Sequence, residues 1–418
     1  MAGPPEKRPT VVRDALHTAA LALLLVPATV QAADSEAGDK IDLTWLQYGE
    51  QSRTRIAEPV VRFTHLMPDG QSFSAQLGID IITGASPTGA LPSGQVQTHT
   101  TPSGRVVTSP PGQIPTAPFQ DHRLSLDADW KRPLGRLVIT TLGGHVSREK
   151  DYQSLGANGE VSVDVWHRMM TLTAGGSINH DSVFPVGGTP AGLSDGTILH
   201  SSANAKRVGN IFFGASRILS RKWMAGVTGS RTFESGYLTE PYKLVSVMND
   251  NGQPVSELTD KRPSIRNRTS LLFSSVYHLT DDVLYNSYRY YTDSWKVRSH
   301  TLEIRYRHQL DTDTYIEPLL RFYTQSAASF YTVGLHDGAP LPDFASSDYR
   351  LGRLQTITLG ATYGFAFDDN PGNWVVRAEY IRQAGDSSPP GAVGIQRGFD
   401  LAPPVNIYAI VVGYTFKY

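Results

Sequence analysis

The sequence predicts an all-β protein: a transmembrane, antiparallel, up-and-down β-barrel of about 16 strands, with a range of about 14–18. Three observations lead to this prediction. Apolar and polar residues alternate over runs of about ten residues. Short turns alternate with long loops along the chain. Aromatic residues collect near the ends of the predicted strands, as is typical of rings placed at a membrane–water boundary.

The alternation of apolar and polar residues defines the strands. In the segment 71–83, Phe73 and Leu77 fall on one face, whereas Ser74 and Asp80 fall on the other. Such period-two runs predict strands with one apolar and one polar face. In chain order, the predicted strands are 41–50, 54–67, 71–83, 121–132, 135–148, 159–166, 170–180, 205–219, 222–235, 264–279, 282–292, 296–310, 313–325, 348–367, 373–383 and 404–418.

The connections between these strands differ in length in a regular way. Short turns are expected at 67–70, 131–135, 166–170, 220–223, 280–282, 311–313 and 368–373. Long loops rich in Gly, Pro, Ser and Asp are expected at 84–120, 149–158, 181–204, 236–263, 326–347 and 384–403. This asymmetry is typical of outer-membrane barrels. The alternative is a soluble β-sandwich or β-helix, but neither of these needs aromatic residues at its strand ends.

The N-terminal segment resembles a secretory signal peptide. Lys7, Arg8 and Arg13 precede an apolar stretch at 15–26, and the small residues of VQA follow at 30–32. This order predicts cleavage after Ala32. Residues 1–32 are then the signal peptide, and residues 33–418 form the barrel domain. The alternative is an N-terminal membrane anchor, but the apolar stretch is short for a membrane-spanning helix of ~20 residues.

Composition excludes several classes of function. The 418-residue chain has a formal net charge of -1 and lacks a long basic run, which argues against a nucleic-acid partner. It contains no cysteine, so disulfides, thiol catalysis, thiolate metal sites and covalently attached haem are excluded. We expect no cofactor. The predicted location is the bacterial outer membrane, in contact with its lipid.

One wall of the predicted barrel is rich in arginine. If the apolar face of each strand points to lipid, the polar face points into the lumen. Four neighbouring strands between residues 264 and 325 then form a possible constriction that favours anionic solutes, because Arg is permanently charged. The alternative is a ladder of Arg–Glu pairs that braces the barrel, and the two interpretations are compatible. The charged residues of this wall are Arg266, Arg268, Arg289, Glu303, Arg305, Arg307, Glu317 and Arg321.

Catalytic and metal sites are not expected. The sequence contains neither GxSxG nor HExxH, and its histidines are scattered. We therefore expect that the protein is not an enzyme. Asp residues at 80, 281, 282, 368 and 369 lie near strand ends and turns, but paired Asp in a turn is more often a solvated cap than a calcium loop.

The chain ends in VVGYTFKY. Tyr414, Phe416 and Tyr418 alternate with Thr415 and Lys417, so the aromatic side chains share the lipid face. The pattern Gly413–x–x–Phe416–x–Tyr418 resembles the C-terminal signal that the barrel-assembly machinery reads. We expect Gly413, Phe416 and Tyr418 to form this assembly signal.

Several segments resemble bacterial outer-membrane proteins catalogued as domain of unknown function 3570. They include GIDIITGASPTGA (78–90), ESGYLTEPYKLV (234–245) and SYRYYTDSWKVRSHTLEIRYRHQL (287–310), and the resemblance extends over nearly the whole mature chain. It implies a barrel without an established activity. Members of the family are often encoded near exported flavin-transferase and thioredoxin-like proteins, so the resemblance also hints at extracytoplasmic redox chemistry.

The sequence is compatible with three functions. The first is a porin-like channel for small solutes, with anionic solutes favoured by the arginine-rich wall, since a barrel of about 16 strands leaves a lumen wide enough for water unless loops fill it. The second is a sleeve or scaffold for an exported partner such as a redox protein. The third is an outer-membrane hydrolase. Base rates for this architecture favour the channel.

Overall fold

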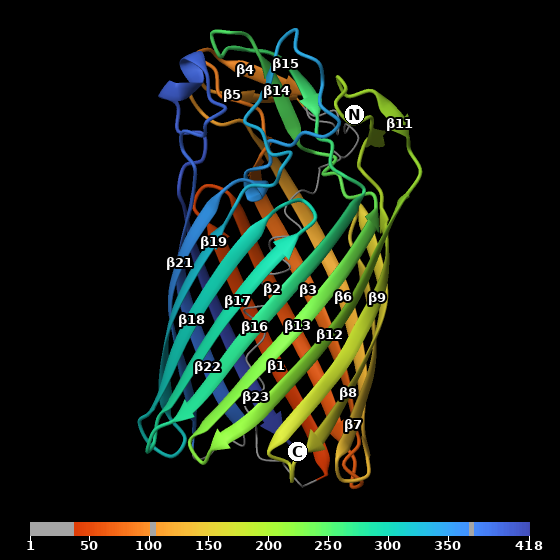
Figure 1. The fold of residues 1–418 in the computed structure, drawn as a ribbon, viewed down its shortest axis with the longest axis vertical. Coiled ribbons are helices and arrows are strands. Elements are labelled where there is room, and N and C mark those ends of the chain that lie inside the picture. The colour runs from red at the N-terminus through yellow and green to blue at the C-terminus, as the bar shows by residue number, and fades with distance from the viewer. Residues whose placement is uncertain (1–36, 101–105, 368–371) are drawn as a thin grey trace, which may run out of the picture.

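The protein is a closed, antiparallel β-barrel of sixteen strands (Figure 1). The computed structural model describes residues 37–100, 106–367 and 372–418. The predicted signal peptide and the predicted turn residues 368–371 lie outside the described residues. Neighbouring strands pair in chain order, and the last strand pairs with the first, so the barrel has no open edge. The predicted fold class and strand count are confirmed.

The barrel strands follow the predicted order with small differences at their ends. They are β1 (Gly38–Glu50), β2 (Thr54–Leu66), β3 (Ser72–Pro87), β6 (Thr116–Leu134), β7 (Val138–Arg148), β8 (Tyr152–Val165), β9 (Met170–Val183), β12 (Asn204–Ser220), β13 (Trp223–Gly236), β16 (Ile265–His278), β17 (Val283–Asp293), β18 (Arg298–Gln309), β19 (Tyr315–Gln325), β21 (Leu354–Ala366), β22 (Gly372–Gly385) and β23 (Val405–Lys417).

The strands expose their apolar faces and turn their polar faces inward. On β3, Leu77 is 43% exposed, whereas the neighbouring inward residues Ser74 and Asp80 are buried. On β6, Leu126 is 47% exposed and Ser125 is buried. An apolar outer surface is the reverse of what a water-soluble sheet shows, and it suits a strand whose outer face meets hydrocarbon.

The predicted loop at 149–158 is wrong. Strand β8 begins at Tyr152, and its residues pair with β7 on one side and β9 on the other. Small residues hide the alternation here. A Cβ atom at Gly156 would lie 2.2 Å from Oδ1 of Asn179, so the side chain of Asn179 on β9 packs directly against the backbone at this glycine.

The predicted strand at 348–367 begins later than expected. Residues Tyr349–Leu351 form the 3-10 helix η1, and strand β21 starts only at Leu354. The side chain of Asp348 accepts a hydrogen bond from the backbone N–H of Arg350, and this bond caps the helical turn. Within the described residues, no helix is both long and apolar enough to cross a membrane.

Long loops fold together over one end of the barrel and form what we call the cap (Figure 1). The cap comprises the described residues of 88–115, 184–203, 237–264, 326–353 and 386–404. Its small elements are β4 (Gln97–Thr100), β5 (Val106–Ser109), β10 (Thr189–Pro190), β11 (Ile198–His200), β14 (Leu244–Met248), β15 (Pro254–Thr259), β20 (Leu335–His336), η1 and η2 (Gly394–Gly398). Strand β14 lies between β15 and β20 in a three-stranded sheet, which joins two of the loops.

Two clusters of apolar side chains form small hydrophobic cores within the cap. Leu91, Met248 and Val333 come from three different loops and pack together, with Val393 and Leu401 of a fourth loop beside them. A second cluster joins Leu193, Val245, Ala345 and Leu335. Because residues from different loops bury each other, the cap is a packed unit rather than a set of independent loops.

A backbone crossing fixes one corner of the cap. Gly394 has a φ of 50°, and a Cβ atom there would lie 1.9 Å from the carbonyl oxygen of Asn251. The side-chain amide of Gln396 donates to the carbonyl oxygens of Pro92 and Gly252, both at 2.8 Å. Three loops therefore meet around one fully buried glutamine, and glycine is required where their backbones touch.

Aromatic rings line the outer face near the short-turn end of the last strands. Tyr414 stacks on Phe416, and Phe416 stacks on Tyr418, with ring centroids 5.5 and 6.1 Å apart. Trp374 of β22 lies 4.6 Å from the ring of Tyr414. Tyr418 remains 70% exposed. This row extends the alternation of β23 to the end of the chain and has the composition of an interfacial aromatic girdle.

Candidate functional site

All eight residues predicted to line the constriction lie on β16 to β19, and five of them form one ladder. Glu317 accepts hydrogen bonds from Arg305 and Arg307, each at 3.0 Å. Glu303 pairs with Arg305 at 3.2 Å and with Arg321 at 2.6 Å. Each carboxylate thus holds two guanidinium groups, as the bracing interpretation expects.

The other three predicted arginines lie beside this ladder. Arg266 pairs with Asp293 at 2.6 Å and packs over the ring of Trp295, 4.2 Å from the centroid. Arg268 pairs with Glu234 of β13 at 2.7 Å. Arg289 is exposed, and among the described residues no ion pair or hydrogen bond involves its guanidinium group.

Positive charge exceeds negative charge on this wall. The six arginines Arg266, Arg268, Arg289, Arg305, Arg307 and Arg321 lie with four carboxylates, those of Glu234, Asp293, Glu303 and Glu317. Sequence reasoning missed Asp293 and Glu234 as partners. Both lie on predicted strands or at their ends, but their pairing depends on the register between strands, which the sequence pattern does not provide.

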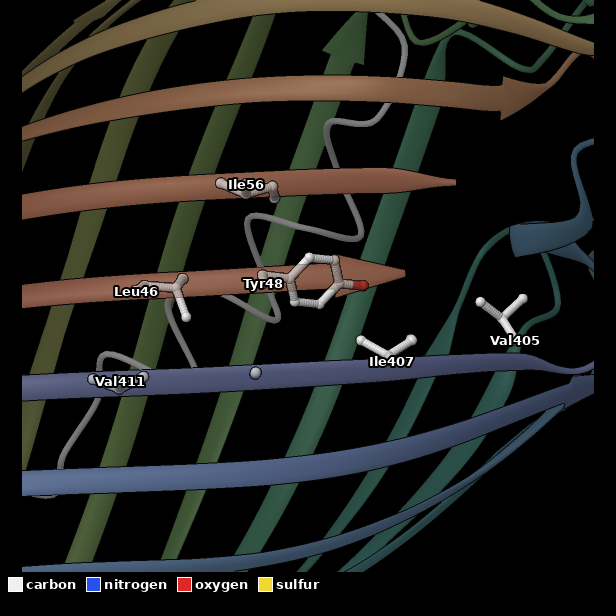
Figure 2. Close-up of a cluster of buried hydrophobic side chains, with 7 residues drawn as sticks. Leu46, Tyr48, Ile56, Val405, Ile407 and Val411 are labelled. Carbon is white, nitrogen blue, oxygen red and sulfur yellow. The ribbon is translucent and has the colours of Figure 1, made fainter. Parts of the chain in front are cut away.

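The lumen also has an apolar wall, where the first and last strands meet. Leu46 and Tyr48 of β1 and Ile56 of β2 are buried beside inward residues of β23. Figure 2 shows these side chains lying next to one another on the three strands. The inward residues of β23 in this cluster are Val405, Ile407, Ala409 and Val411. The seam of the barrel is therefore joined by side-chain packing as well as by backbone hydrogen bonds.

A buried network of charges ties two cap loops together. Asp348 accepts hydrogen bonds from Arg350 at 2.6 Å and from Arg262 at 2.9 Å. Arg262 also donates to Asp260 at 2.6 Å, and Arg350 reaches Glu240 at 3.3 Å. The nearby guanidinium groups of Arg350 and Arg262, together with Lys243, hold the pKa of Asp348 below its usual range, although burial alone would raise it.

Lys243 lies at the inner edge of this network and is fully buried. Its ammonium donates to the hydroxyl of Ser86 at 3.0 Å and to the carbonyl oxygen of Pro87, both at the end of β3. Burial lowers the pKa of Lys243 to about 8, against a partial opposing effect of Asp348. The lysine thus fastens the cap to the rim of the barrel.

A partly enclosed pocket lies where the cap meets the barrel. Its empty space is about 670 Å³, part of it open to solvent. The wall comes from the β1–β2 turn, from the ends of β3 and of β21 to β23, and from three cap loops. Arg53 and Asp348 are the charged residues among the described residues of this wall.

Three carboxylates converge near the rim of the barrel. Ligand oxygens of Asp121, Glu149 and Asp151 all lie within 4.8 Å of one another, and each residue is buried. The hydroxyl of Tyr242 donates to Asp151 at 2.7 Å. The sequence did not indicate this group, because Asp121 lies on β6 and the other two occupy the short turn after β7.

The aspartates that the sequence singled out lie elsewhere. Asp80 pairs with Arg123 on the inner wall, and Asp282 accepts hydrogen bonds from Tyr306 at 2.5 Å and His308 at 2.9 Å. Asp368 and Asp369 lie outside the described residues. Nδ1 of His300 forms a hydrogen bond with the hydroxyl of the outward-facing Tyr288 at 2.7 Å.

The predicted assembly-signal residues all belong to the end of the chain. Gly413 takes the inward parity of β23, whereas Phe416 and Tyr418 belong to the outer aromatic row. The backbone groups of Tyr418 and Asp39 exchange two hydrogen bonds, at 3.0 and 3.2 Å, at the start of β1. These residues therefore complete the seam of the barrel, whereas their recognition by the assembly machinery stays a prediction.

The protein is thus a closed sixteen-stranded β-barrel with a charged inner wall and a packed cap. The chain belongs to the family described as protein of unknown function (DUF3570), which matches residues 13–416. The resemblance inferred from the sequence motifs is thereby confirmed. Among curated proteins, none matches this sequence.

Solved structures with a similar shape are outer-membrane barrels. The TodX deltaS2S3 mutant monoaromatic hydrocarbon channel shares 10% identity at a TM-score of 0.43, over 95% of this chain and 94% of its own. OmpTdeltaL8 of Vibrio cholerae shares 8% at 0.41, over 91% and 99%. The ferric enterobactin receptor PfeA of Pseudomonas aeruginosa shares 11% at 0.42, over 91% of this chain and only 59% of the receptor. Structural similarity at these TM-scores supports no conclusion beyond the barrel fold, which the structure of this chain already shows.

Proposed function

We propose that this protein is an outer-membrane channel for small anionic solutes. The excess of guanidinium groups over carboxylates on the wall formed by β13 to β19 carries this proposal. Fixed positive charge along a water-filled path lowers the free energy of an anion relative to a cation. The proposal includes export by the signal peptide at 1–32, insertion by the barrel-assembly machinery, and location among the lipids of the outer membrane.

The bracing role of the ladder supports this function rather than competing with it. Carboxylates that each hold two guanidinium groups fix those groups on the wall, as Glu303 and Glu317 do. Arg289, which makes no such contact with a described residue, is the charge best able to meet a passing solute. The sleeve for an exported redox partner stays a prediction from the family resemblance.

The test is the ion selectivity of the purified protein in planar lipid bilayers. Under a KCl gradient, the reversal potential should show a preference for chloride. Arg289→Gln should lower the chloride-to-potassium permeability ratio by about twofold, as expected for a charge worth ~0.4 kcal/mol to the permeating ion. Arg289→Glu should lower the ratio further, with little effect on folding because Arg289 is exposed.

The matched control is Arg298→Gln. Arg298 begins β18 with an exposed side chain of outward parity, so its loss removes the same charge without changing the lumen. A wild-type preference for potassium would contradict the proposal. So would equal selectivity in the wild type and Arg289→Glu, or the lack of any discrete conductance.

A further inference from the structure

The pocket between cap and barrel has a mostly apolar wall. Its empty space of about 670 Å³ includes a part that is open to solvent. Loops 88–115, 326–353 and 386–404 contribute to it together with the ends of barrel strands. Its apolar lining includes Leu91, Tyr331, Val333, Leu354, Leu401 and Val405. Such a wall favours a ligand with a hydrocarbon or aromatic body.

Arg53 is the cation of this wall, and among the described residues no ion pair involves it. Nη1 of Arg53 is buried, and no described atom is its hydrogen-bond partner. The guanidinium lies over the ring of Tyr349, 4.9 Å from the centroid, and this contact leaves its N–H groups free to donate. A buried donor without a partner is unfavourable, and a bound acceptor would satisfy it.

The other charged residue of the pocket is already paired. Asp348 accepts hydrogen bonds from Arg262 at 2.9 Å and from Arg350 at 2.6 Å, so its charge is compensated from the cap side. Arg53 is therefore the side chain that gives the pocket its charge preference. A single planar guanidinium matches the two oxygens of a carboxylate and balances its one negative charge, whereas a phosphate dianion would leave one negative charge uncompensated.

We propose that this pocket is a saturable binding site for a small amphipathic carboxylate. Arg53 pairs with the carboxylate, and the apolar wall holds the body of the ligand. The inference deepens the proposed function, on which it rests, because it names the chemical class of solute that stops beneath the cap. Simple inorganic anions would pass the charged wall without being held in the pocket.

The experiment measures equilibrium binding of three probes to the full chain in lipid nanodiscs. They are 4-phenylbutyrate, the neutral 4-phenylbutanamide, and acetate, which carries the charge without the apolar body. The wild type should bind 4-phenylbutyrate saturably and more tightly than either of the others. Arg53→Gln should weaken the binding of 4-phenylbutyrate about tenfold or more and leave that of the amide nearly unchanged.

Two further variants keep the test decisive. Arg55→Gln removes an equal charge from the same hairpin, but Arg55 is exposed and has outward parity, so binding should match the wild type. Arg53→Lys keeps the charge and loses the planar fork, so affinity should be intermediate. Heat-modifiable migration on SDS gels shows that each variant has a folded barrel.

Three results would overturn the inference. They are binding of 4-phenylbutyrate by Arg53→Gln as tightly as by the wild type, equal affinity of the wild type for the acid and the amide, and no saturable binding of either. Bilayer selectivity separates this failure from that of the channel. Chloride preference without ligand binding would contradict the binding site in the pocket but not the channel. Ligand binding without conductance would contradict the channel.

Discussion

Lys243 shows how a single residue can make the cap sensitive to pH. The side chain is 1% exposed, and Asp348, Glu240, Arg262 and Arg350 surround it. Burial lowers its pKa from 10.5 to about 8 in the folded cap. An open cap would hydrate the ammonium and restore the ordinary pKa, so the open state binds a proton more tightly than the closed state.

The sign of the pH effect follows directly. Between pH 8 and pH 10.5 the open state holds more protons, so the stability of the closed cap rises as pH increases through this window. Above pH 10 the trend is opposed, because burial raises the pKa of Tyr331 and Tyr349 from 10.0 to about 12. We therefore expect the opening of the cap to become up to about tenfold rarer per pH unit between pH 8 and pH 10.

Hydrogen exchange of peptides covering β14, corrected for the intrinsic exchange rate, measures this opening. The control is Lys243→Met, which fills a similar space without an ionisable group. Its exchange should not slow across the same window. An equal pH dependence in the variant and the wild type would show that other groups control the opening.

At the scale of the residue, the sequence predicted which charges share the lumen but not which of them pair. Parity along each strand placed Arg266, Arg305 and Arg321 on one wall, because side-chain direction has a period of two. The partner of Arg266 is Asp293, whose position relative to it depends on the stagger between β16 and β17. Arg53 could not be singled out, since its surroundings come from loops without periodicity.

At the scale of the element, β23 holds the barrel closed. It pairs with β22 along one edge and with β1 along the other. Deleting residues 416–418 removes the pairs Ile41↔Phe416 and Lys40↔Lys417 and the two hydrogen bonds between Asp39 and Tyr418. It also removes two rings from the aromatic row.

We expect the truncated chain to be exported but not assembled. Most of it should remain extractable by urea and should lack heat-modifiable migration on SDS gels. The matched control is Tyr418→Phe, which keeps the ring and the backbone contacts and should assemble like the wild type. Normal membrane insertion of the truncated chain would refute the role assigned to Phe416 and Tyr418.

The elements themselves were largely predictable. The sequence predicted all sixteen barrel strands in order, because a strand between lipid and lumen needs alternating residues. Strand β8 was recognised only in its second half, where the small residues end. The sheet of β14, β15 and β20 was not predicted, because two of its strands are buried or irregular and its third has only two residues.

At the scale of the whole molecule, we expect the cap to control access to the lumen by opening as a unit. Lys261 and Ala345 join two of its loops, each backbone N–H donating to the other's carbonyl oxygen at 3.0 Å. Such a pair has Cα atoms ~5.5 Å apart, within the span of a disulfide. Because the chain contains no cysteine, a disulfide introduced here has no competing thiol.

The double variant Lys261→Cys, Ala345→Cys should conduct less when oxidised than when reduced. A disulfide worth ~2–4 kcal/mol to the closed arrangement should lower the open probability about tenfold or more. Single-channel recording before and after addition of a reductant measures the change. Each single cysteine variant is a control and should not respond. Equal conductance of the oxidised and reduced forms would show that solutes pass without movement of these loops.

The cores of the cap have a consequence for how such a protein can diversify. Both clusters, the one around Met248 and the one around Val245, consist of loop residues alone. A substitution inside them can therefore be compensated by another within the cap, while the barrel keeps its register and its seam. Natural selection could then alter the surface of the cap without changing the barrel below it.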